Sequence, residues 1–204
     1  MGTLQCQIDQ LFEGKAFERP LFYNYDGGLR FELSKGGSSI EKFLLAITRA
    51  TTICADIFDA NSYMVVCLRA WVDASRFSLR KELEALRGLG LKIPNERCIW
   101  ADPSSDEDLD GRWVSLAFRS AVSQIQSLLW IACASDFSSI APRPMCSVYL
   151  FDMEKGVLVF PYDDRGMDVV GPNREFLATL YGKHNKLLLE YDRERMRETF
   201  EEPK

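Results

Sequence analysis

The stretch Tyr162-Asp163-Asp164-Arg165-Gly166-Met167-Asp168 is the densest group of side chains that could do chemistry, and it directly follows the apolar run Val157–Phe160. Carboxylates gathered in this way are ligands for a divalent cation, and the planar fork of Arg165 matches a phosphate or a carboxylate. One interpretation is therefore a binding site made of Asp163, Asp164, Arg165 and Asp168, with Arg30 and Arg49 adding positive charge.

The same stretch also has a purely structural interpretation. Gly166 supplies a special backbone conformation in a turn or bulge, the aspartates accept hydrogen bonds from nearby amides, and Arg165 forms an internal ion pair. Pro161 and Gly166 make a helix improbable here. We therefore predict a turn at the end of a strand, and its residues leave the binding and the structural role open.

No other motif indicates catalysis. His184, the single histidine, lies in a basic loop without the G-x-S-x-G elbow or the cysteine-centred signature of nucleophilic enzymes. Neither of the common phosphate-binding glycine loops is present. We predict no catalytic residue, no metal site and no cofactor, and the sequence favours a protein that is not an enzyme.

Composition and charge limit the partners. The chain has 204 residues, 47% of them hydrophobic, and a net charge of -5, so we expect one globular domain over residues 1–204. An acidic surface repels phosphate backbones, which disfavours nucleic acid. The six cysteines are scattered without metal-ligand spacing, and we expect them to be reduced and mostly buried. No signal sequence or apolar span is evident, which predicts a cytoplasmic protein without a membrane partner.

Several elements can be placed from their patterns. Apolar positions predict helices over 3–12, from Ser38 to Phe58 behind a Ser38/Glu41 capping box, and over 118–133. The apolar run Tyr63–Leu68 indicates a strand inside a sheet, and two runs predict a hairpin over 147–160. Pro172 and Asp192 are placed to begin shorter C-terminal helices.

Helices that do not alternate regularly with strands predict an α+β fold. We expect a largely antiparallel sheet packed against two long amphipathic helices, with shorter helices near both ends of the chain.

The chain resembles a bacterial domain-of-unknown-function family marked by a C-terminal Y-D-D-R-G-x-D signature. The residues that carry the resemblance span most of the chain: Leu29–Leu33, Arg49-Ala50, Ile57-Phe58, Tyr162–Asp168, Leu180-Tyr181, Glu190–Arg193 and Phe200. Leu187–Leu189 departs from the pattern, because an aromatic residue is expected after this leucine run. The resemblance implies a bacterial, cytoplasmic setting and no particular activity.

Two hypotheses for the function follow. The first is an interaction protein of the immunity or regulatory type that binds a partner protein through its acidic surface, because such a surface is steered toward a basic one. The alternative is an enzyme, or a binder of a metal or small ligand, that uses the Asp-Asp-Arg-Gly-x-Asp turn. The sequence does not indicate an oligomeric state.

Overall fold

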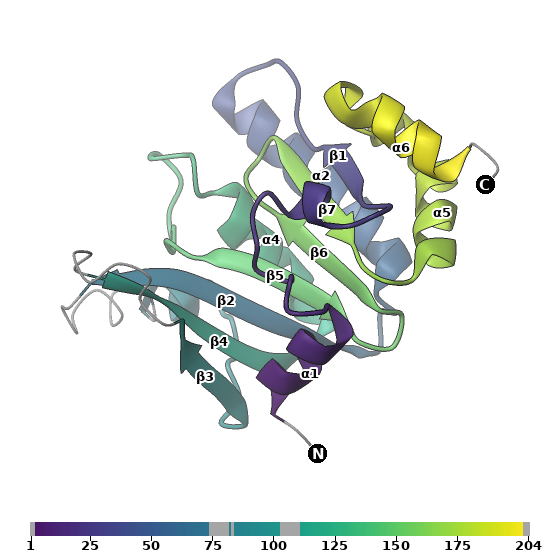
Figure 1. Ribbon diagram of the computed structural model, residues 1–204. Coiled ribbons are helices and arrows are strands. Elements are labelled where there is room, and N and C mark those ends of the chain that lie inside the picture. Colours follow the sequence, from purple (N-terminus) through teal and green to yellow (C-terminus); the bar gives the residue numbers. More distant parts are fainter. Residues whose placement is uncertain (1–2, 74–81, 83, 103–110, 202–204) are drawn as a thin grey trace.

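A computed structural model describes residues 3–73, 82, 84–102 and 111–201 (Figure 1). Within these residues, seven strands form one antiparallel sheet in the order β1-β7-β6-β5-β2-β4-β3. The strands are β1 (Leu29–Glu32), β2 (Tyr63–Asp73), β3 (Arg97–Ala101), β4 (Gly111–Ala121), β5 (Ser147–Asp152), β6 (Val157–Pro161) and β7 (Gly166–Val170). The predicted α+β class and antiparallel sheet are confirmed. Tyr63–Leu68 lies within β2, which has a neighbour on each side.

The helices lie on both faces of this sheet. They are α1 (Leu4–Leu11), α2 (Ser39–Ile57), α4 (Ile125–Cys133), α5 (Arg174–Lys183) and α6 (Arg193–Phe200), with short 3-10 turns at η1 (Leu21–Asn24), η2 (Val122–Gln124), η3 (Asn185–Leu187) and η4 (Glu190–Asp192). Figure 1 shows α2 and α4 behind the sheet and α1 in front of it. None of the described helices has both the length and the apolar character needed to cross a membrane.

The helix α2 forms as its sequence predicts. Ser38 Oγ accepts a hydrogen bond from the amide of Glu41, and the Glu41 carboxylate accepts one from the amide of Ser38, so the capping box is complete. The buried side of the helix, which includes Phe43, Ala50 and Ile53, packs with α4 in the larger of two apolar clusters. This cluster covers one face of the sheet.

The segment before β1 covers part of the opposite face. Ile8 of α1 and Phe12 at its C-terminal cap, followed by Ala16 and Leu21, pack on side chains of β2, β4, β5 and β6 to form a second apolar cluster. Thr3 caps α1 by accepting a hydrogen bond from the amide of Cys6. Further along β2 than Val65 and Cys67 of this cluster, Trp71 is exposed.

One helix starts later than its pattern predicts. Strand β4 continues through Phe118 to Ala121, and α4 begins only at Ile125. Phe118 and Ser120 pair with Val66 and Met64 of β2, so the residues that fit a helical stripe also fit the alternation of a strand. Pairing with β2 decides between the two, because it satisfies the backbone hydrogen bonds of this segment.

All six cysteines are free, and Cys54, Cys67 and Cys133 are fully buried. Burial raises the pKa of these three thiols to about 12. Because the thiolate is the reactive form, we expect alkylation of the native protein at neutral pH to modify the exposed Cys6 first and to leave these three unmodified. Mass spectrometry after timed iodoacetamide treatment measures this. Modification of Cys54 as fast as that of Cys6 would contradict the buried position.

Candidate functional site

The turn between β6 and β7 holds most of the conspicuous carboxylates. Asp163 Oδ1 accepts hydrogen bonds from the amides of Arg165, at 2.7 Å, and Gly166, at 3.2 Å. Arg165 Nε donates to Asp163 Oδ2 at 2.8 Å, although 72% of the arginine side chain remains exposed. Asp163 therefore shapes the turn, as an aspartate in this position commonly does.

Asp164 faces a different neighbour. It is buried and accepts a hydrogen bond from Ser34 Oγ at 3.1 Å. Burial raises the pKa of its carboxyl group, and Asp163 adds to this effect, whereas the hydrogen bond from Ser34 opposes it. Across the described residues, no group of three or more His, Cys, Asp and Glu side chains has an arrangement that could hold a metal ion.

Asp168 belongs to a buried ion-pair network. Arg30 donates two hydrogen bonds to its carboxylate, from Nε at 2.8 Å and from Nη2 at 3.1 Å, and the amide of Phe22 donates a third at 3.1 Å. The same guanidinium donates to Asp192 at 3.1 Å, which also accepts from the Tyr23 hydroxyl at 2.6 Å. Burial raises the pKa of Asp168, and Arg30 opposes that rise. The network joins β1 and β7 to η1 and η4.

The six residues predicted to bind are thus divided among several places. Arg30 and Asp168 meet directly, whereas Arg49 lies elsewhere and donates to the carbonyl of Glu32 at 3.0 Å. Most of their polar atoms have partners inside the protein, and Arg165 is the most exposed of the charged groups. The predicted strand-end turn is confirmed. A ligand-binding role for these residues stays a prediction.

His184, for which we predict no catalytic role, is buried at the end of α5. Its Nε2 lies 2.7 Å from Asp56 Oδ2. Lys183 Nζ donates to the other oxygen of the same carboxylate at 2.6 Å. This arrangement ties α5 to α2.

A cleft with different chemistry lies on the sheet face that α1 covers only in part. Alternate residues of a strand point to the same face, so Cys67, Arg69 and Trp71 of β2 share the face of the second apolar cluster. The register places Ser115 of β4 and Ser147 of β5 on either side of Arg69. On this face of β2, the buried Arg69 therefore follows the apolar side chains of Val65 and Cys67.

Two arginines meet at this cleft. Arg19, from the exposed loop after α1, donates to Ser147 Oγ at 2.8 Å and to the Tyr149 hydroxyl at 3.3 Å. Its guanidinium lies 4.8 Å from the ring centre of Phe160. Among the described residues, no carboxylate forms an ion pair with Arg19, so its positive charge is matched only by neutral hydroxyl groups.

Arg69 is more deeply buried than Arg19, and one N–H donor of its guanidinium group lacks a partner among the described residues. The residue is only 9% exposed, and its guanidinium donates to Asp102 and to the carbonyl of Phe17. Within the described part of the chain, its Nε has no hydrogen-bond partner, and neither has the buried Ser115 Oγ opposite. Burial lowers the pKa of Arg69, and the positive charge of Arg19 adds to this. An unsatisfied buried donor costs about 1–3 kcal/mol, and more when it is charged.

The hollow beside these arginines is small. It has a volume of about 210 Å³ and is lined by Phe17, Arg19, Arg69, Trp113 and Tyr149. A second hollow of about 310 Å³ lies on the α1 side of Arg69 and is also lined by acidic residues, namely Asp9, Glu18 and Asp102. The charge on the two sides of Arg69 therefore differs, and only the Arg19 side is suited to an anion.

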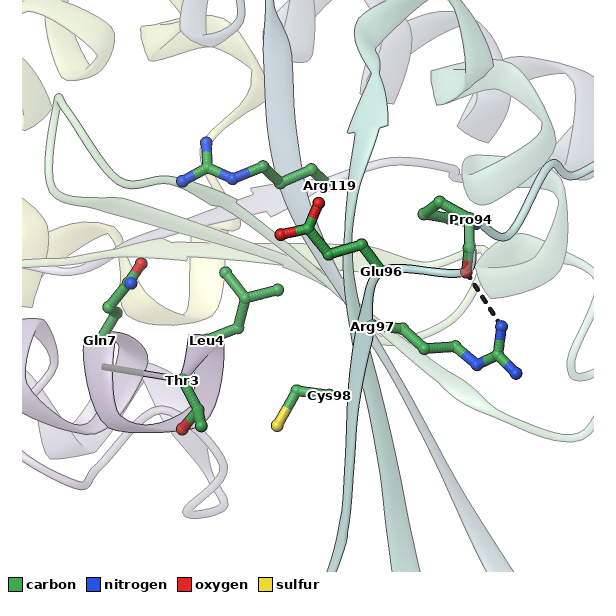
Figure 2. Close-up of a pocket in the computed structure, with 8 residues that line it drawn as sticks. All are labelled: Thr3, Leu4, Gln7, Pro94, Glu96, Arg97, Cys98 and Arg119. Atoms are coloured by element: carbon green, nitrogen blue, oxygen red, sulfur yellow. Dashed lines mark hydrogen bonds between the residues drawn. The ribbon is translucent and has the colours of Figure 1, made fainter. Parts of the chain in front are cut away.

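A larger hollow, of about 420 Å³, lies between α1 and the strands β3 and β4. Figure 2 shows Leu4 and Gln7 of α1 on one side of this hollow and Cys98 of β3 on the other, with Arg119 of β4 above them. Its charged side chains, Glu96, Arg97 and Arg119, are exposed and of both signs. It contains none of the buried, unpartnered polar atoms found beside Arg69. We therefore regard the cleft at Arg19 and Arg69 as the stronger candidate.

The sequence interpretation did not identify this cleft. Arg19 and Arg69 are far apart in the sequence, and neither belongs to a motif. One signal was present, however. Arg69 follows the apolar run of β2 and is itself followed by Trp71, so the side chains on one face pass from apolar to charged and then to a large aromatic.

Comparison with models of known families gives a match over most of the chain. Residues 4–192 match the model of the family described as Domain of unknown function (DUF3885). Searches among curated proteins and among solved structures found no significant match. The chain therefore belongs to this domain-of-unknown-function family, which assigns it no activity.

Proposed function

We propose that this domain binds a small organic anion, with a carboxylate or phosphate group placed between Arg19 and Arg69. The observation that carries the proposal is the hollow that the buried Arg69 and the exposed Arg19 line together: among the described residues, Arg69 Nε has no hydrogen-bond partner and Arg19 forms no ion pair. Two guanidinium groups that converge on one hollow offer the planar, multidentate donors that carboxylates and phosphates accept.

Ser147 and Tyr149 support the same function. Their hydroxyl groups hold Arg19 over the hollow, and Tyr149 itself is fixed by a ring stack on Phe160, with 4.5 Å between the ring centres. The donors are therefore positioned before a ligand arrives, which limits the entropy lost on binding. This proposal shares its class with the alternative sequence hypothesis, a small-ligand binder, but it uses different residues.

The side-chain Nε–H signals of the arginines provide a direct test by NMR. Titration with sodium phosphate or sodium acetate at constant ionic strength is expected to shift the signals of Arg19 and Arg69 and to saturate. The exposed Arg165 serves as the reference for weak, non-specific association. Equal shifts at Arg165, or none at Arg69, would refute the proposal.

The substitution Arg19→Gln is expected to weaken anion binding about tenfold or more, because a hydrogen bond to a charged group contributes about 1.5–3 kcal/mol. Arg19 is exposed, so the fold is expected to remain intact. The matched control is Arg165→Gln, which removes an exposed arginine outside the cleft. Calorimetric titration of both variants measures the effect, and equal affinity in the two would contradict the role of Arg19.

A further inference from the structure

An aromatic hollow adjoins the arginine pair at the point where β5 begins. β5 pairs with β2 only as far as Ser147, opposite Arg69, whereas β2 and β4 remain paired beyond this row. Next to the end of the β2–β5 pairing at Ser147 lies a hollow of about 290 Å³. Its lining includes Arg69, Trp71, Trp113, Met145, Ser147 and Tyr162. Its volume is close to the lower limit of ordinary small-molecule sites.

The two tryptophans are held in place from within the sheet. Trp71 and Trp113 are directly opposite each other in the register of β2 and β4, and their ring centres lie 5.6 Å apart at 77°. A side chain at Gly111 would reach to within 2.6 Å of the Trp71 indole nitrogen. The absence of a side chain there lets the indole lie close against the backbone.

Despite this support, Trp71 remains 45% exposed. An exposed tryptophan keeps much of its apolar ring in water, and such rings gather at binding surfaces more often than at other parts of a protein surface. Tyr162, the first residue of the signature stretch, contributes to the same hollow. Tyr162 therefore connects the signature stretch to the candidate site, whereas Asp163, Asp164 and Asp168 do not line this hollow.

The aromatic hollow shares two lining side chains with the anion site. Arg69 and Trp113 line both hollows, and the Arg69 guanidinium lies 5.4 Å from the Trp113 ring centre. A ligand group bound by Arg69 is therefore next to the indoles. Flat rings pack on indole faces and edges with more contact than saturated rings, which are thicker and lack the complementary charge distribution.

We infer that the ligand is a planar aromatic ring joined to a carboxylate or a phosphate group, with the anion between Arg19 and Arg69 and the ring against Trp71 and Trp113. This inference rests on the proposed function, since it assigns the ligand class of the same site. The acid groups on the other side of Arg69 keep the anionic end on the Arg19 side.

Two matched pairs of ligands test the inference. Benzoate and cyclohexanecarboxylate carry the same anion on a flat and on a saturated ring, and phenyl phosphate and cyclohexyl phosphate do the same for a phosphate. Calorimetric titration is expected to give at least about fivefold tighter binding for the flat member of a pair. The pair that binds more tightly identifies the anionic group as carboxylate or phosphate.

Substitutions in the hollow complete the experiment. Trp71→Leu is expected to abolish the preference for the flat ring while leaving the affinity for cyclohexanecarboxylate nearly unchanged. Trp100 of β3 lines the hollow on the α1 side of Arg69 and not the aromatic hollow. Trp100→Leu is therefore the control and is expected to retain the preference. Circular dichroism and urea unfolding establish that each variant is folded.

The outcomes separate the two proposals. Equal affinity for the flat and the saturated member of both pairs would overturn the inference about the ring and leave the anion site standing. Loss of the preference in Trp100→Leu but not in Trp71→Leu would also overturn it. Binding of none of the four compounds would overturn the inference, and it would overturn the proposed function as well if phosphate and acetate also fail to bind.

Discussion

Replacing Asp168 with alanine is expected to lower the free energy of unfolding by about 3–5 kcal/mol. Asp168 is 1% exposed and accepts three hydrogen bonds, two from Arg30 and one from the amide of Phe22. The substitution leaves the amide without its partner and leaves Arg30 with Asp192 as its remaining acid. Removal of one member of a buried pair costs far more than the pair contributes as a whole, because the other charge stays buried.

Urea unfolding of the two proteins measures this loss. The control is Glu190→Ala, which also removes an acid from an arginine pair, here with Arg193, but at a position where the carboxylate side chain is 78% exposed. Exposed pairs contribute only about 0–1 kcal/mol. A loss below about 1 kcal/mol in Asp168→Ala, equal to that of the control, would mean that the network of Arg30 does not hold β1 and β7 to η1 and η4.

The second large effect is expected from Gly166→Ala, which should destabilise the protein by about 1–3 kcal/mol. A side-chain carbon at position 166 would lie 1.9 Å from the Tyr162 hydroxyl oxygen and 2.4 Å from the ring carbon that bears it. The Tyr162 ring must therefore move, although it is partly buried and lines the aromatic hollow. We expect weaker binding of aromatic anions as well as lower stability.

A double-mutant cycle identifies the cause. In a Tyr162→Ala background, the further change Gly166→Ala is expected to cost less than about 0.5 kcal/mol, because the clash has been removed. Gly182→Ala is the control: this glycine lies in α5 with nothing near its side-chain position, so alanine should stabilise the helix by up to about 1 kcal/mol. An equal cost of Gly166→Ala in both backgrounds would show that Tyr162 is not responsible.

The parts of the fold that sequence could predict are those decided by neighbouring residues. The capping box at Ser38 and the turn at Gly166 depend on contacts within a few positions. The strand that contains Tyr63–Leu68 was found from its own continuous apolar run, although its pairing partners are distant in the sequence. The start of α4 was not predictable in this way. Phe118 fits a helical stripe and a strand alike, and its pairing with Val66 of β2 decides between them.

The candidate site was even harder to predict from local sequence patterns. The signature turn was found because its charged residues are adjacent, but its aspartates turn mainly toward internal partners. Arg19 and Arg69 line one hollow because the segment after α1 passes over the row of Arg69: the Phe17 carbonyl accepts a hydrogen bond from Arg69, and Arg19 donates to Ser147, opposite Arg69 in the register. No local sequence pattern specifies where this segment crosses the sheet. A site formed by the segment and a strand therefore cannot be predicted until the sheet register is known.

The network around Arg30 also bears on how the nascent chain folds during synthesis. Arg30 and Asp168 are 138 positions apart, and Tyr23 and Asp192 are 169 apart. At ordinary translation speeds the first pair waits on the order of ten seconds for its later member. Until β7 emerges, β1 has no strand to pair with, and its apolar side chains have no sheet to join. Chaperones that protect unpaired strands are therefore expected to contact the first part of the chain during this interval.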